Sequence, residues 1–184
     1  MILACLLWGL TSCPLAAQLA AQSAPAAEDW LSGRALMLLV NDGQGRVLQR
    51  IPLCRRGCFG IRYTHSVALS PVEDWFYARG RTIVLDKTIY QDFGAGLPHS
   101  PEAGQLMQVA GGQVSISGYD RPLPELVLRV GRVARHTLIL PRCCHPDAGP
   151  SLRSHEEELA LSRLAKPGSA VAMSLSFTSF RYRP

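Results

Sequence analysis

The sequence predicts a mostly β protein, an antiparallel β-sandwich or small barrel with one late helix. Short apolar runs recur along the chain, and several alternate apolar with polar residues in the period-two pattern of a half-buried strand. Turn-forming residues separate these runs, because 16 of the 184 residues are Gly and 13 are Pro. One segment near the C-terminus instead carries the start and stop signals of a helix. Many short strands with a single helix favour a sandwich or a barrel.

Two predicted hairpins begin the domain. Residues 35–40 are apolar and end at Asn41-Asp42-Gly43, a strong turn signal, so residues 46–51 are the expected partner strand. Residues 59–67 alternate between two faces, and residues 72–78 run back after a tight connection. Further strands are expected at residues 82–85, 88–90, 106–109, 114–117, 126–130, 136–140 and 171–177, with turns at residues 110–112 and 118–120.

The late helix is predicted from local end signals. Ser154 and Glu157 have the spacing of a capping box, in which the two side chains satisfy the first backbone amides of a helix. Three leucines follow at positions 159, 161 and 164. The run then stops at Lys166-Pro167-Gly168, as helices do before proline and glycine.

The N-terminal residues indicate export. No charged residue occurs in residues 1–27, where an apolar stretch is followed by small residues, as in a secretion signal without the usual positive start. We therefore expect a signal peptide and linker at residues 1–27 and a single exported β-rich domain at residues 28–184, in the periplasm or at the envelope. Ordinary cleavage between residues 17 and 27 is slightly favoured. The alternative is a lipoprotein anchored through Cys13, because Leu10-Thr11-Ser12-Cys13 resembles a lipobox.

Four cysteines remain in the expected domain, and an oxidising compartment favours disulfides. Of the three pairings, two join the loop of Cys54 and Cys58 to Cys143 or Cys144, and the third strains a ring between neighbouring cysteines. A zinc site that also uses His145 is the alternative, but adjacent cysteine ligands fit a tetrahedral site poorly. We expect a disulfide, without deciding between the two pairings, and we expect no metal and no cofactor.

The positive charge does not indicate nucleic-acid binding. The chain has 19 Lys and Arg against 14 Asp and Glu, a net charge of +5. These basic residues are scattered, whereas a nucleic-acid binder usually concentrates them in one stripe or helix. We therefore expect no nucleic-acid partner.

A middle segment resembles a known family. It contains Tyr63-Thr64-His65-Ser66-Val67, Pro71-Val72-Glu73, Thr88-x-Tyr90 and Phe93-Gly94-Ala95-Gly96-Leu97-Pro98. These motifs look like those of a bacterial domain-of-unknown-function family, numbered 1850. Its members are small exported proteins, often encoded beside tripartite (TRAP-type) transporters whose binding protein is of the immunogenic-protein type. The resemblance implies an accessory role in uptake, with transporter membrane or solute-binding subunits, or a small solute, as partners.

The same segment holds the candidate binding site, because polar and aromatic side chains gather there beside a glycine loop. Its candidate ligand-binding residues are Tyr63, His65, Ser66, Glu73, Tyr90, Phe93, Gly94 and Gly96. The register of the second hairpin is open: pairing of Val67 with Val72 places Ser66 opposite Glu73, and a slip of one residue places His65 there. Two simpler interpretations are a hydrogen bond that closes the hairpin and glycines that only supply positive φ angles.

Three functions follow, in order of preference. The first is an exported accessory or ligand-binding component of a tripartite uptake system, and the second is a structural envelope protein. The third is a hydrolase that uses His65, Ser66 and Glu73. It is disfavoured because neighbouring strand residues point to opposite faces and no Gly-x-Ser-x-Gly or His-Glu-x-x-His motif is present.

Overall fold

The computed structural model describes residues 31–54, 57–92, 96–141 and 156–182. Nearly all of them belong to one compact unit, Gly33–Phe180. Residues 31–32 and 181–182, at the ends of two strands, fall outside it. No helix in the described ranges is long and apolar enough to span a membrane.

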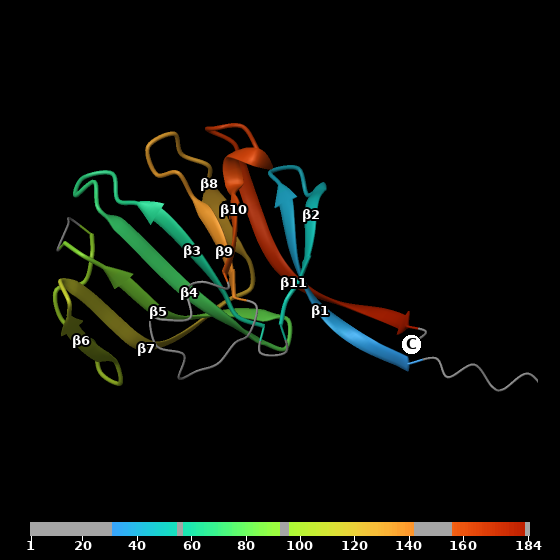
Figure 1. The fold of residues 1–184 in the computed structure, drawn as a ribbon, viewed down its shortest axis with the longest axis horizontal. Coiled ribbons are helices and arrows are strands. Elements are labelled where there is room, and N and C mark those ends of the chain that lie inside the picture. Colours follow the sequence, from blue (N-terminus) through green and yellow to red (C-terminus); the bar gives the residue numbers. More distant parts are fainter. Residues whose placement is uncertain (1–30, 55–56, 93–95, 142–155, 183–184) are drawn as a thin grey trace, which may run out of the picture. The chain divides into compact units, whose positions relative to one another are not determined.

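The described strands form two sheets (Figure 1). The four-stranded sheet has the order β2 (Val47–Pro52), β1 (Leu31–Asp42), β11 (Ala170–Tyr182) and β8 (Leu126–Arg129). The seven-stranded sheet has the order β10 (Glu156–Ala160), β9 (Thr137–Pro141), β3 (Phe59–Thr64), β4 (Pro71–Arg79), β5 (Thr82–Tyr90), β7 (Gln113–Leu123) and β6 (Leu106–Ala110). Neighbouring strands pair antiparallel in both sheets.

The two sheets share one hydrophobic cluster. It includes Leu38 and Met173 from the four-stranded sheet and Phe59, Ile61 and Phe76 from the seven-stranded sheet. Each sheet has an open strand order that does not close on itself. The mostly β, antiparallel, sandwich-like fold predicted from the sequence is therefore confirmed, and the barrel alternative is not adopted.

A second, smaller cluster lies on the seven-stranded sheet. Its buried members are Val72, Tyr90, Leu97, Val114 and Ile116. Tyr63 packs against both clusters and so lies where they meet. This boundary positions one part of the candidate site.

The first hairpin forms where the sequence predicts it. The Asp42 carboxylate accepts hydrogen bonds from the backbone amides of Gln44 and Arg46, each at 2.9 Å. These bonds hold the pKa of Asp42 below its ordinary value. Gly45 adopts a φ of 81°, which a residue with a side chain rarely adopts.

The late helix was predicted wrongly. Residues 156–160 form strand β10, and a single 3-10 turn follows at Leu161–Arg163. β10 pairs with β9, so that Leu159 lies opposite Leu138, while Leu161 is fully buried. Pairing and burial outweigh the weak local preference for a helix. Ser154, the first residue of the expected capping box, lies outside the described residues.

The turn expected at residues 118–120 lies inside β7. Gly118 and Asp120 have positive φ angles of 81° and 43°, which are the backbone conformations that turn residues favour. Here they lie in a bulge: Leu85 pairs with Arg121 and Lys87 with Ser117, so the register between β5 and β7 shifts at this point. The two short strands expected at residues 82–85 and 88–90 are one strand, β5.

Candidate functional site

The β3–β4 hairpin is shorter than expected. Thr64 pairs with Pro71, Tyr63 with Val72, and Arg62 with Glu73, so residues 65–70 form the connecting loop. Neither register considered for Val67 is adopted. β3 stops at Thr64 because His65 begins a turn: its amide bonds the Ser70 carbonyl at 2.9 Å.

His65 closes this turn with its side chain as well. Its Nδ1 accepts a hydrogen bond from the Ala68 amide at 3.1 Å, and its carbonyl accepts one from the Leu69 amide at 2.9 Å. His65 thus fixes the conformation of the loop.

The tip of the turn presents two large apolar side chains. Val67 is 69% exposed and Leu69 is 68% exposed. Leu69 has a φ of 52°, in the left-handed region that a bulky residue rarely adopts. Ser66 is also exposed. We call Val67 and Leu69 the hairpin tip.

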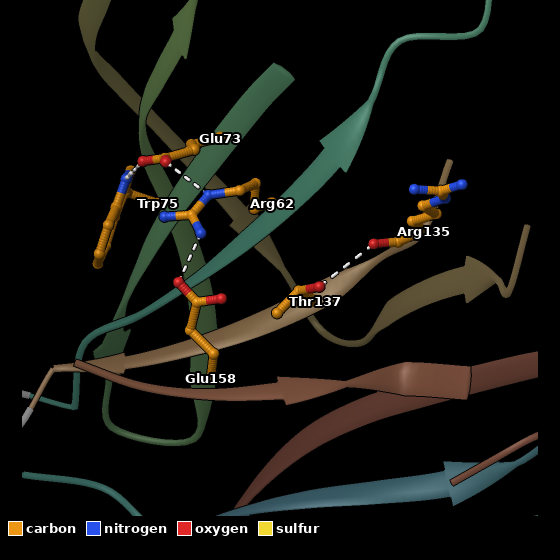
Figure 2. Close-up of polar contacts among 6 residues, drawn as sticks. All are labelled: Arg62, Glu73, Trp75, Arg135, Thr137 and Glu158. Atoms are coloured by element: carbon orange, nitrogen blue, oxygen red, sulfur yellow. Dashed lines mark hydrogen bonds and ion pairs between the residues drawn. The ribbon is translucent and has the colours of Figure 1, made fainter. Parts of the chain in front are cut away.

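An ionic network occupies the outer face of the hairpin (Figure 2). Arg62 Nε donates to Glu73 Oε1 at 2.8 Å, and its Nη1 donates to Glu158 Oε1 at 2.5 Å. Trp75 Nε1 donates to the other Glu73 oxygen at 3.2 Å. The Glu73 side chain is 11% exposed and that of Glu158 is 48% exposed. One arginine therefore joins strands β3, β4 and β10.

A glycine makes room for the aromatic part of this network. Gly60 pairs with Trp75, and a Cβ atom at Gly60 would lie 3.2 Å from atoms of the indole. Such a contact is closer than ordinary packing allows. Glycine therefore lets the Trp75 ring lie against β3.

Asp74 lies on the opposite, inner face. Thr88, its partner across the sheet, donates a hydrogen bond from Oγ1 to Asp74 Oδ1 at 2.7 Å. Burial raises the pKa of Asp74, although the hydroxyls of Thr88 and Tyr63 lower it in part. Burial and the neighbouring carboxylate together raise the pKa of Tyr63. The Tyr63 ring also lies 5.6 Å from the ring of His136, whose pKa burial lowers.

Tyr90 ties the next loop to the sheet. Its hydroxyl donates to the carbonyl of Pro98, and its ring belongs to the same buried cluster as Leu97 and Val72. Gly96 is exposed with a φ of 88°, and a Cβ atom there would touch nothing, so its conformation explains the glycine. Phe93 and Gly94 lie outside the described residues.

The predicted residues are thus divided among three places. Tyr63 and Tyr90 lie on the inner face, Glu73 on the outer face, and His65 and Ser66 in the turn. The side-chain hydrogen bonds described above join His65 to Ala68, and Glu73 to Arg62 and Trp75, and none of them joins His65 to Glu73.

Sequence reasoning missed Arg62, Asp74 and the hairpin tip. Arg62 can be recognised as a partner of Glu73 only when the hairpin register is known, because the pairing of Thr64 with Pro71 places Arg62 opposite Glu73. Asp74 had a local signal, since it falls between Val72 and Phe76 on the apolar face of the expected strand.

The predicted cysteine site lies partly outside the described residues. Cys54 and Cys58 are described, whereas Cys13, Cys143, Cys144 and His145 are not. Within the described part of the chain, no group of three or more His, Cys, Asp or Glu side chains could hold a metal ion.

Comparison with known proteins finds a match to one family model. Residues 59–146, which run from the start of β3 to just beyond β9, match the model of the family described as Domain of unknown function (DUF1850). This match supports the family identity that the motifs indicated. No curated protein and no solved structure matches the chain.

Proposed function

We propose that this protein, a match to that family across strands β3 to β9, is an exported accessory component of a tripartite solute-uptake transporter. In this proposal the β3–β4 hairpin contacts a transporter subunit. The uncharged N-terminal stretch supports export, and the family resemblance supports the transporter. The hairpin lies within the matched residues, which favours it as the contact surface.

The exposed hairpin tip carries the proposal. Val67 and Leu69 each expose more than two thirds of their surface, although they are large apolar residues. Leu69 also holds a left-handed backbone conformation that costs about 1 kcal/mol or more. Neither feature stabilises the folded chain, because both side chains are exposed and do not pack in the core. Both are explained if the tip is covered by a partner.

The shape of the tip favours a protein partner over a small solute. Solute sites are concave and surround their ligand, whereas a hairpin turn projects from the sheet. The hydrogen bonds of His65 fix the turn before any partner binds, which limits the entropy lost on association. Val133 adds a further exposed apolar side chain beside Ala134, whose carbonyl accepts from the Thr64 amide at the base of the turn.

Capture from the native envelope tests this function. The tagged protein is cross-linked in a bacterium that carries it naturally, and the captured proteins are identified by mass spectrometry. We expect transporter subunits with the unchanged protein and their loss with the double variant Val67→Ser, Leu69→Asn. Asparagine tolerates the left-handed conformation, so the melting temperature should change little.

A matched control uses a distant exposed valine. Val109 on β6 is 68% exposed, and Val109→Ser should leave capture unchanged. The same mass spectra identify the mature N-terminus, expected between residues 17 and 27 or at a lipidated Cys13. Capture that survives the tip variant, or a mature protein that keeps Met1, would contradict the proposal.

A further inference from the structure

A groove adjoins the hydrophobic cluster that the two sheets share, because three of its lining residues also pack against that cluster. Its volume is about 330 Å³, at the lower end of the range for small-molecule sites. Apolar side chains from three places line it, namely Leu36 on β1, Leu53 after β2 and Ala78 on β4. Arg34 on β1 and Phe177 on β11 also line it.

The groove continues the hydrophobic core. Along β1, Val40 and Leu38 are fully buried, Leu36 packs against the same cluster, and Arg34 takes the next position on that face. Phe177 likewise follows a series of buried residues on alternate positions of β11. Arg34, which is exposed, therefore lies on the core-facing side of β1 just beyond the last apolar residue on that side.

One wall of the groove is packed closely from behind. Gly57 has a φ of 65°, and a Cβ atom there would lie 2.5 Å from Ala78 Cβ and 2.7 Å from Leu36 Cδ2. The backbone of the loop before β3 therefore contacts two lining residues directly. Only glycine permits this approach, which keeps the wall closed.

The charge of Arg34 is not balanced by the residues described around it. Its guanidinium carbon lies 4.7 Å from the centre of the Phe177 ring, and the lining residues include no Asp or Glu. Arg46, Arg62 and Arg79 each pair with a carboxylate, whereas Arg34 pairs with none in the described ranges. Stacking on an aromatic ring orients a guanidinium and leaves its N–H donors available for an anion.

We infer that this groove binds a small organic anion with an apolar body, whose carboxylate pairs with Arg34. The apolar body lies along Leu36, Leu53 and Phe177, where it removes apolar surface from water. The positive charge of Arg34 favours an anionic ligand, and the apolar lining favours a ligand whose remaining part is apolar. This site is distinct from the hairpin tip and does not depend on the transporter partner.

Octanoate and octanol form a suitable pair of probes, because they differ mainly in the charged head group. Calorimetric titration of the intact protein should give at least tenfold tighter binding of octanoate than of octanol. Arg34→Gln should reduce octanoate affinity to the level of octanol. Arg34→Lys keeps the charge and should retain part of the preference for octanoate.

Arg132→Gln is the matched control, since Arg132 is an exposed arginine outside the groove, and it should bind octanoate unchanged. Equal binding of the two probes to the unchanged protein would overturn the inference, and this comparison decides the question even if Arg34→Gln does not fold. Full octanoate affinity in a folded Arg34→Gln variant would overturn it as well.

Discussion

At the scale of single residues, Asp74 places a carboxyl group on the core-facing side of the seven-stranded sheet. Burial of a charged carboxylate is unfavourable unless hydrogen bonds compensate for the lost water. The Thr88 hydroxyl supplies one such bond, and the Tyr63 hydroxyl supports the same group. The remaining cost appears as a raised pKa, so this position favours the protonated acid.

The raised pKa of Asp74 predicts a pH dependence of stability. Between the ordinary pKa of 3.8 and the raised pKa of the folded protein, the folded protein binds this proton more tightly than the unfolded chain does. The free energy of unfolding should therefore fall as the pH rises from about 3.8 through the folded pKa. Asp74→Asn should remove this slope and be at least as stable as the unchanged protein at neutral pH. Urea unfolding between about pH 4 and pH 7 measures it.

Asp86→Asn provides the control, because Asp86 is exposed on the neighbouring strand β5, and it should keep the slope. An Asp74→Asn variant with the original pH dependence would show that another group titrates in this range.

At the scale of elements, the Arg62 network connects three strands of one sheet. Arg62 belongs to β3, Glu73 to β4 and Glu158 to β10 at the sheet edge. Exposed ion pairs contribute little to the free energy of unfolding. Removing one member of a buried pair costs more, because the other charge is then left without a partner. The two glutamates should therefore differ in their effect on stability.

Glu73→Gln should lower the free energy of unfolding by about 1–3 kcal/mol, because its carboxylate is the more buried partner of Arg62. Glu158→Gln should cost less than about 1 kcal/mol, since nearly half of that side chain is exposed. Thermal and urea unfolding at neutral pH measure both. Glu157→Gln, at an exposed neighbouring position, is the control and should have no effect. Equal losses at Glu73 and Glu158 would mean that burial does not set the strength of this network.

At the scale of the whole molecule, the sheet order places the start of β3 beside the end of β9. β3 and β9 pair antiparallel, with Gly60 opposite Ile139, so the start of β3 adjoins the end of β9. Cys58 immediately precedes β3, and Cys143 follows the end of β9 by two residues. A disulfide between the loop of Cys54 and Cys58 and the segment of Cys143 and Cys144 would link the residues that precede β3 in sequence to those that follow β9.

We therefore predict that peptide mapping without reduction finds Cys54 or Cys58 linked to Cys143 or Cys144. The bond would close a loop of roughly 90 residues, for which the chain-entropy estimate is about 4 kcal/mol. Replacement of Cys143 and Cys144 by Ser should lower the melting temperature, because it removes a stabilisation of up to about 4 kcal/mol. Four cysteines that all react with an alkylating reagent, or one zinc ion bound per chain, would contradict this prediction.

The sequence by itself determined the features that depend on neighbouring residues. The first hairpin was predictable because the Asp42 carboxylate binds the amides of its own turn. The mostly β fold was predictable because alternation reports directly which face of a strand is apolar. The family match was likewise predictable from motifs within one segment.

Only the tertiary structure decided the features that depend on residues distant in the sequence. β10 is a strand because β9 pairs with it, which overrides a helix signal worth only a few tenths of a kcal/mol per residue. Glu73 binds Arg62 because the turn of His65 sets the hairpin register. Arg34 lies beside Phe177 because β1 and β11 are neighbours in the sheet, although many residues separate them in sequence. Such contacts form only when the chain folds, so local patterns do not contain them.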